Sequence, residues 1–294
     1  MQATRGCPHT CAFCSVSAFN GAAQRRRPAE EVAAEVAALP ERFFLLVDDS
    51  LAAEPEYAKA LFRALAPLRK HWVSQVTLKS TDDPELIRLA AESGCVGVFV
   101  GLETFSDRAL ESVDKGFNQV EEYRSRIRIL HQNGIAVEAG VVLGFDADGP
   151  GVFAKTLRLL DELEIDMIQV SVLTPLPGTR FFKEMASRIL DRNWAHYDYH
   201  HVVFQPRRMT AESLQAGHDW LTREFYQPWR ILRRLWRQAL RPLGARGLPY
   251  AAAVNFAYLG RILRWSIKGW DPAAEGGLPE RRPAPQTPRL AQVC

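Results

Sequence analysis

Residues 4–14 read TRGCPHTCAFC and bring three cysteines, Cys7, Cys11 and Cys14, onto one short loop. The short intervals between them let the chain turn back on itself, so the three thiolates can converge on one metal centre. A closed zinc site takes four ligands, and an iron–sulfur cluster normally takes four cysteines. Three cysteines would therefore leave one iron of a cubane free for a small molecule. The alternative is a structural zinc site with His9 as the fourth ligand.

The composition of the whole chain is that of a globular protein. It has 294 residues, 47% of them apolar and 24% charged, which fits one large domain with or without an appendage and excludes wholesale disorder. The net charge of +3 is too small to indicate nucleic-acid binding by itself. An odd number of cysteines, three of them clustered, predicts a metal site in a reducing cytoplasm rather than a disulfide framework. Neither a long apolar run nor an apolar leader is seen, so we expect no membrane span and no secretory signal.

Five short, nearly continuous apolar runs predict strands that are covered on both faces. Amphipathic helical patterns lie between these runs, and the alternation predicts βαβ units with a parallel sheet. Residues 1–5 are a candidate for the end of a sixth strand. An open doubly wound sheet is the alternative that the pattern alone leaves. The five runs are 43–47, 73–78, 96–102, 135–143 and 167–173.

The pattern changes after Pro206. Residues 211–226 and 228–241 read as helices without strands between them, and residues 223–246 contain seven Arg and one Glu. From residue 271 the chain is rich in Pro, Gly and Arg, which predicts a disordered tail. We therefore expect three regions: a core over 1–205, a helical extension over 206–270 and a tail over 271–294.

The cysteine loop resembles the signature of the radical S-adenosylmethionine (SAM) enzymes, in which an aromatic residue, here Phe13, precedes the last cysteine. The resemblance extends over about residues 1–205. It implies an α/β fold with a partial, TIM-like (β/α)6 barrel, followed here by a C-terminal helical extension. It also implies that Cys7, Cys11 and Cys14 hold a [4Fe–4S] cluster and that SAM chelates the remaining iron. One electron from the cluster then cleaves the sulfonium C–S bond, and the resulting 5′-deoxyadenosyl radical takes a hydrogen atom from a substrate.

Carboxylates follow two of the predicted strands, at the strand ends where parallel α/β folds place function. By the resemblance, Asp48 and Asp49 occupy the place where the superfamily grips the SAM amino group, and a carboxylate is a natural partner for an ammonium. Their alternative role is to cap the helix that follows. Glu103 resembles a polar residue near the SAM ribose or methionine, with a helix-entry carboxylate as the alternative.

Two further loops resemble segments that contact SAM. Residues 140–145 are similar to the strand motif whose backbone contacts adenine, which points to Gly144 and Phe145. A plain glycine between a strand and a loop is the alternative there. Residues 173–179 match a P-x-P-G-T loop found in many cobalamin-associated relatives, and this match places Pro175 beside SAM.

Together, these loops resemble the cobalamin-binding-type radical SAM proteins that carry an extra C-terminal domain, a group related to the hopanoid methylases. Such proteins usually begin with a cobalamin-binding domain, whereas this sequence starts within the first predicted barrel strand. We expect one of three arrangements: a cobalamin-binding domain encoded separately, a truncated or misassigned start, or an enzyme that works without cobalamin. The cobalamin requirement is therefore left open.

The reaction that the resemblance implies is C–H functionalisation of an unknown substrate, with methylation as one form of it and a lipid-like molecule as one candidate. A reducing electron donor such as flavodoxin or ferredoxin is implied as well. Two other classes stay open: a non-catalytic or truncated iron–sulfur or zinc-binding protein, and an Arg-rich module that binds nucleic acid or a membrane surface. Nucleic acid is disfavoured, because an Arg-lined helix is usually a solvated face. We expect a cytoplasmic protein, with residues 223–270 as the segment that would lie on a membrane.

Overall fold

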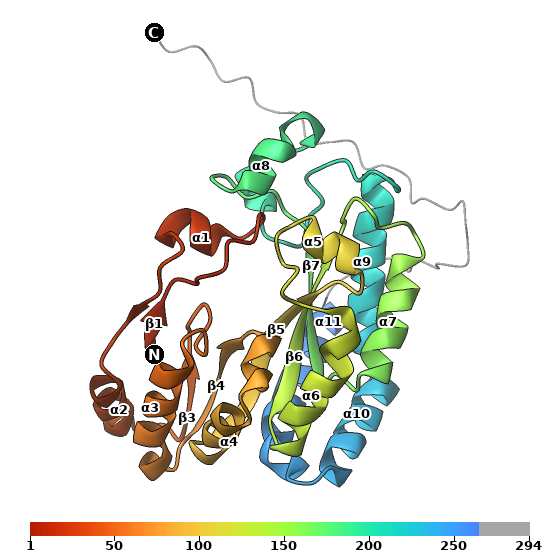
Figure 1. Ribbon diagram of the computed structural model, residues 1–294. Coiled ribbons are helices and arrows are strands. Elements are labelled where there is room, and N and C mark those ends of the chain that lie inside the picture. The colour runs from red at the N-terminus through yellow and green to blue at the C-terminus, as the bar shows by residue number, and fades with distance from the viewer. Residues whose placement is uncertain (265–294) are drawn as a thin grey trace.

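A five-stranded parallel sheet forms the centre of the computed structural model, which describes residues 1–264 (Figure 1). The strands lie in sequence order, and each is hydrogen-bonded to the next one along the chain. A doubly wound sheet would reverse its order at a switch point, so this order excludes that alternative and confirms the partial barrel. The five predicted runs are all confirmed as strands: β3 (Phe43–Leu46), β4 (His71–Val76), β5 (Cys95–Glu103), β6 (Ala136–Leu143) and β7 (Met167–Val172).

The start of the chain does not form a sixth strand of this sheet. Met1 alone reaches β3, where its amino group donates to Leu45 O at 2.9 Å and its carbonyl accepts from Val47 N at 2.8 Å. Strand β1 (Thr4–Arg5) instead pairs antiparallel with β2 (Arg25–Arg26). The physical reason is local, because the amides that would continue a sixth strand are bound by the carboxylate of Asp48.

Helices that alternate with the strands cover the outer face of the sheet. Each presents fully buried apolar side chains to that face, as Leu61, Leu86 and Leu160 show. Proline and capping residues fix where they begin: α4 starts at Pro84, and the Asp83 side chain accepts a hydrogen bond from Leu86 N. The covering helices are α2 (Ala29–Ala38), α3 (Pro55–Leu65), α4 (Pro84–Glu92), α6 (Tyr123–Gln132) and α7 (Val152–Glu162).

Three long helices end the described chain, α9 (Ala211–Phe225), α10 (Pro228–Leu240) and α11 (Leu248–Arg264), and the short helices α1 (Ser15–Asn20), α5 (Asp107–Glu111) and α8 (Arg180–Glu184) lie in loops. Helix α9 packs on β7 and α7, whereas α11 lies against the inner face of β5, β6 and β7. On that face the Tyr250 hydroxyl donates to Glu138 Oε2 at 3.0 Å. The boundary at residue 206 stays a prediction, and the predicted tail over 271–294 lies outside the described residues. Within residues 1–264 no helix is long and apolar enough to cross a membrane.

The outer edge of β7 is sealed by side chains instead of another strand. The Tyr226 hydroxyl accepts from Ile168 N at 3.0 Å and donates to Ile168 O at 2.7 Å. Two residues further along, His218 Nε2 lies 3.2 Å from Val170 O. The sheet can therefore end after β7 without leaving these buried backbone groups unpaired.

Candidate functional site

The cysteine loop lies between β1 and the short helix α1 (Ser15–Asn20), above the carboxyl ends of the strands (Figure 1). Its position is fixed by two backbone hydrogen bonds, from Ala12 N to Val113 O at 2.9 Å and from Phe181 N to Ala12 O at 3.0 Å. Cys14 is the N-cap residue of α1. Cys7, Cys11 and Cys14 are all free thiols. The predicted ligands thus share one loop that is held from two sides.

The two aspartates after β3 hold the chain that leads into this loop. Asp49 Oδ2 accepts a hydrogen bond from Gly6 N at 2.8 Å. Gly6 has a φ of +94°, and a Cβ there would lie 2.4 Å from Ala23 O, so only glycine fits. Asp48 is fully buried, its carboxylate accepts from the amides of Ala3 and Thr4, and burial raises its pKa. Asp48 therefore anchors backbone, and the half-buried Asp49 is the aspartate nearer to solvent.

A buried ion pair lies at the end of β5, beside the cysteine loop. Glu103 has a φ of +64° and is paired with Lys115, and both side chains are about 90% buried. Gly101 lies directly beneath the pair, because a Cβ there would meet Glu103 Oε1 at 2.3 Å and Lys115 Nζ at 2.7 Å. Asn118 Nδ2 donates to Gly101 O at 2.9 Å and holds the following turn in place. Glu103 was predicted, but Lys115 was not.

The charges in this region depend on one another. Burial opposes the charge of Lys115, but the adjoining Glu103 carboxylate outweighs it and raises the pKa of Lys115. Burial also raises the pKa of Cys7, and that of Cys11 to about 11, although the Lys115 charge lowers the pKa of both thiols. Thiols in such a place stay protonated unless a positive partner arrives, and bound iron would be such a partner.

Two aromatic residues border the loop. The His9 ring stacks on Phe117 with 4.0 Å between the ring centroids, and burial lowers the pKa of His9. Tyr199, with a φ of +67°, accepts a backbone hydrogen bond from Val172 N at 2.7 Å, and its hydroxyl interacts with Ser15 next to Cys14. The stacking gives His9 a packing role. Sequence reasoning missed Tyr199, which no motif distinguishes from its aromatic neighbours.

In the loop after β6, the backbone predicted to contact adenine is already bound within the protein. The amides of Gly144 and Phe145 both donate to the Asp148 carboxylate, at 2.9 and 3.0 Å. Gly144 has a φ of +104°, and a Cβ there would lie 2.8 Å from the side chain of Leu214. Its lack of a side chain therefore allows α9 to pack, and Phe145 is buried. Asp148 is itself buried, which raises its pKa to about 6.

The proline loop after β7 reaches the cysteine loop through a short helix. Pro175 is buried, and Thr179 Oγ1 accepts from Phe182 N at 3.1 Å at the start of α8 (Arg180–Glu184). Phe181 of that helix donates to the cysteine loop at Ala12 O. Phe13 is half-buried next to Cys14. The loop thus supports the cysteines from the side opposite to the Asp48 and Asp49 contacts.

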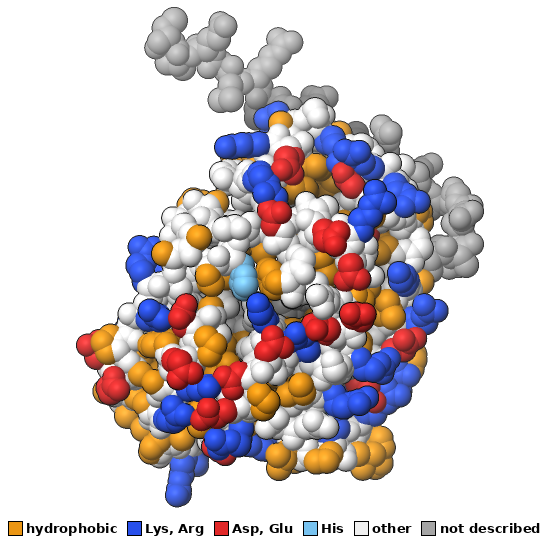
Figure 2. All heavy atoms as spheres, viewed as in Figure 1, with side chains coloured by type: hydrophobic (Ala, Val, Ile, Leu, Met, Phe, Trp, Pro, Cys, Tyr) orange, Lys and Arg blue, Asp and Glu red, His pale blue; other side chains and the backbone are white. Residues whose placement is uncertain are grey.

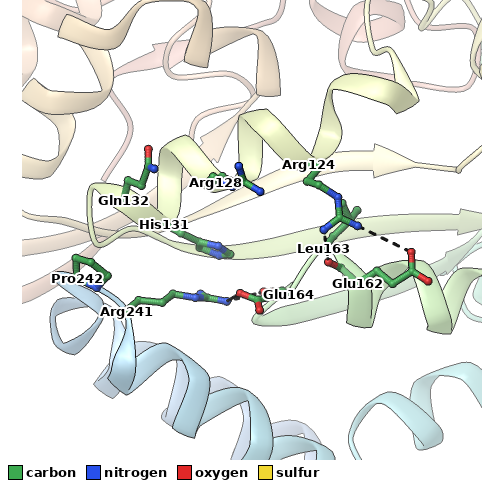
Figure 3. A pocket seen from close by; sticks show the side chains of 9 residues that line it. All are labelled: Arg124, Arg128, His131, Gln132, Glu162, Leu163, Glu164, Arg241 and Pro242. Carbon is green, nitrogen blue, oxygen red and sulfur yellow. Dashed lines mark hydrogen bonds and ion pairs between the residues drawn. The ribbon is translucent and has the colours of Figure 1, made fainter.

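A separate cavity of about 260 Å³ lies far from the cysteines, where α6 and α7 end (Figure 3). Two pairs of its lining residues are ion-paired, Arg124 with Glu162 at 3.9 Å and Arg241 with Glu164 at 3.2 Å. His131 and Arg241 also contact the buried Asp166 behind the lining, at 2.9 and 2.8 Å. The cavity lies at the amino ends of β6 and β7, because its lining comes from the end of α6 and from the turn between α7 and β7. Contacts at that end of a barrel serve stability.

The Arg-rich stretch 223–246 is mostly folded inward. Arg230 and Arg233 are ion-paired with Asp161 of α7, and Arg241 is paired with Asp166 and Glu164. Arg234 and Arg246 donate to backbone carbonyl oxygens, at Phe225 and Ala91. Five of its seven arginines thus stabilise the fold, which removes the basis for a solvated cationic face that binds nucleic acid.

The donor set of the loop fits an iron–sulfur cluster with an open iron. It offers three thiols, a buried cation and buried carboxylates within one region of the fold. Among residues 1–264 no three His, Cys, Asp or Glu side chains are grouped closely enough to hold a single metal ion. The fit therefore rests on the identity of the donors and on their surroundings.

The sequence profile of the Radical SAM superfamily matches residues 1–160, which include the cysteine loop and the Glu103–Lys115 pair. The chain belongs to the radical SAM superfamily. A bacteriochlorophyllide d C-12(1)-methyltransferase of Chlorobaculum tepidum is 32% identical over 239 residues, covering 79% of this chain and 52% of the relative. A hopanoid C-2 methylase of Rhodopseudomonas palustris is 26% identical over 189 residues, covering 61% of this chain and 36% of the relative.

Solved structures of radical SAM proteins share the fold. TsrM, a methyltransferase from Kitasatospora setae with cobalamin and a [4Fe–4S] cluster bound, aligns with a TM-score of 0.57 and 21% identity over 76% of this chain and 46% of TsrM. The cobalamin-dependent enzyme OxsB aligns with a TM-score of 0.58 and 11% identity over 92% of this chain and 48% of OxsB. The radical SAM chain described here spans about half, or less, of the length of these relatives. Membership confirms the expected class and implies a [4Fe–4S] cluster and SAM as cofactors.

Proposed function

We propose that Cys7, Cys11 and Cys14 hold a [4Fe–4S] cluster with one open iron and that the protein cleaves SAM reductively at that iron. When bound, the cluster supplies the electron that breaks the sulfonium C–S bond and yields the 5′-deoxyadenosyl radical. The observation that carries the proposal is the placement of three free thiols on one fixed loop beside the Glu103–Lys115 ion pair.

The ion pair suits the amino-acid end of SAM. That end carries an ammonium and a carboxylate, and Glu103 and Lys115 offer one charge of each sign at the carboxyl end of β5. We assign Lys115 to the SAM carboxylate and Glu103 to its ammonium or ribose, with Asp49 as a second acceptor. Because the pair is buried, SAM would have to replace each partner with a group of the same sign, so that neither buried charge is left without a partner.

The remaining predicted residues support the site through packing. We propose that Phe13, Gly144, Phe145 and Pro175 shape the wall around the SAM adenine through the loops that they anchor. Since the amides of Gly144 and Phe145 are already bound to Asp148, this wall acts by shape and exclusion of water rather than by these two donors. Asp48 contributes only indirectly, by holding the entry into the cysteine loop.

Exposed apolar side chains on the inner face of the half-barrel favour an apolar substrate. Along β3, Phe44 and Leu46 are buried under the outer helices, whereas Phe43 and Leu45 point to the other face and are 47% exposed each. The Phe43 ring lies 6.2 Å from that of Tyr250, which is on α11 and covers the inner face. We propose C–H functionalisation, such as methylation, of a large apolar substrate on this face. Relatives named as methyltransferases of a bacteriochlorophyllide and a hopanoid are consistent with this class.

We further propose that a reducing donor such as flavodoxin or ferredoxin supplies the electron, and that the protein works in the cytoplasm, where free thiols persist. By analogy with the cobalamin-dependent relatives, we also propose that the protein requires cobalamin. A separate cobalamin-binding domain would be the partner that supplies it. Adding cobalamin to the turnover assay tests this point directly: methyl transfer that needs it supports the methyltransferase form of the proposal.

The experiment is anaerobic reconstitution with iron and sulfide, followed by dithionite and SAM, with detection of 5′-deoxyadenosine. The Cys14→Ala variant should lose both the product and the cluster absorbance. Cys95→Ala is the matched control, because Cys95 is a free, fully buried thiol in β5 and should not change either readout. A complete cluster in wild type that leaves SAM intact would refute the proposed activity and favour a non-catalytic iron–sulfur protein.

A further inference from the structure

Helix α10 presents a stripe of large apolar residues to solvent, whereas two of its three buried side chains are polar. Trp229, Leu232, Trp236 and Leu240 are 54%, 63%, 67% and 67% exposed, and their spacing of three, four and four residues places them on one stripe. The buried face of the same helix consists of Ile231, Arg234 and Gln238.

The inward-facing arginine explains how this helix is held. Arg234 is 5% exposed and donates to Phe225 O and to Asn255 Oδ1, each at 2.7 Å. Its guanidinium also lies 3.8 Å from the centroid of the Phe225 ring. The helix is thus attached to α9 and α11 through the contacts of Arg234 and through the core packing of Ile231 and Leu235, and the apolar stripe takes no part in that attachment.

The surface around the stripe is rich in apolar side chains and arginines, and the nearby carboxylates of Asp161 and Glu164 are paired with arginines of this segment. Leu243, just beyond the helix, is 56% exposed and extends the stripe. Figure 2 shows hydrophobic side chains along the lower margin of the molecule, where Figure 1 places the end of α10. From residue 225 to residue 264 the sequence has eight Arg and no Asp or Glu. Arg237, next to Trp236, has no ion pair within the described part of the chain.

We propose that α10 docks the protein on an anionic lipid surface, with the stripe in the boundary between headgroups and acyl chains. Tryptophan and leucine on one helix face, beside arginine, are the residues that such an interface favours. Residues 225–264 add no acidic residue, and Arg237 beside Trp236 is left to meet anionic headgroups with its positive charge. This inference goes beyond the proposed chemistry, and neither depends on the other.

The stripe, and not the arginines as a group, is therefore the docking element. Arg230 and Arg233 are already paired with Asp161, which reduces what they can offer to lipid phosphates. The sequence predicted that residues 223–270 would lie on a membrane, and the structure narrows this membrane-binding segment to one face of α10.

The test is flotation of the reconstituted full chain with vesicles of phosphatidylcholine, with and without roughly 30% phosphatidylglycerol. We expect binding to the anionic vesicles and a loss of about tenfold or more in the Trp236→Gln/Leu240→Gln variant. Arg237→Gln should weaken binding about fivefold, and only to the anionic vesicles. Trp194→Gln is the matched control, because Trp194 is 60% exposed on a distant loop and should not affect binding.

Two outcomes would overturn the proposal. One is equal vesicle binding by the wild type and the stripe variant, each with unchanged circular dichroism and cluster absorbance. The other is that the wild type binds no vesicles and is a dimer by light scattering, whereas the stripe variant is a monomer. The second outcome would assign the stripe to a second copy of the chain.

Discussion

Replacing Lys115 by methionine should separate the structural and the SAM-binding roles of the ion pair. The side chains of Lys115 and Glu103 are only 11% and 10% exposed, so Lys115→Met leaves a buried carboxylate without its partner. Breaking a buried pair in this way costs about 3–5 kcal/mol of unfolding free energy. The Glu103→Met/Lys115→Met double variant removes both charges and should return to within about 1 kcal/mol of the wild type.

The effect on SAM should follow a different pattern. If Lys115 meets the SAM carboxylate, losing one charged hydrogen bond costs about 1.5–3 kcal/mol, or roughly 10- to 150-fold in affinity. The double variant should therefore recover the stability of the wild type, but its affinity for SAM should remain low. Anaerobic urea unfolding of the apo-protein and equilibrium dialysis of SAM against the reconstituted protein measure the two effects. Wild-type SAM affinity in the double variant would refute the assignment, and wild-type stability in Lys115→Met would refute the burial of the pair.

Three other changes give further predictions. Gly101→Ala would place a Cβ 2.3 Å from Glu103 Oε1, so SAM affinity should fall about tenfold, whereas Gly149→Ala, with nothing within 4 Å, should leave it unchanged. Burial raises the pKa of Asp148 to about 6, so the native state keeps this proton at a higher pH than the unfolded chain does. The apo-protein should accordingly lose up to about 3 kcal/mol of stability as the pH rises from about 4 to about 6, and an equal slope in Asp148→Asn would contradict this. Arg234→Met removes two donated hydrogen bonds from buried acceptors, and urea unfolding should show a loss of about 3 kcal/mol.

The sequence was sufficient for features that depend on neighbouring residues. The apolar runs predicted all five strands, because that pattern lies in consecutive residues. Helix α6 likewise ends just before Gly134, whose φ of +72° is a backbone conformation that glycine adopts readily. That the three cysteines of the C-x3-C-x2-C spacing bind a cluster stays a prediction.

Features that depend on distant contacts were not predicted in detail. Asp48 binds amides 44 and 45 residues away, and no local pattern distinguishes that role from contact with SAM. Gly144 meets Leu214 of α9, so its purpose is visible only once α9 is in place. The arginines of α10 looked like a solvated face because their partner, Asp161, belongs to a different helix.

The sealing of β7 by Tyr226 has a consequence for how the chain is made. The backbone of Ile168 and the hydroxyl of Tyr226, which pair with each other, are 58 residues apart in the sequence. At about 5–20 residues per second, a ribosome needs roughly 3–12 s to synthesise that interval. During those seconds the last strand of the nascent sheet exposes unpaired backbone groups, and a neighbouring nascent chain can pair with them. Premature termination before Tyr226 would make that exposure permanent, so fragments ending there should aggregate even though all five strands are complete.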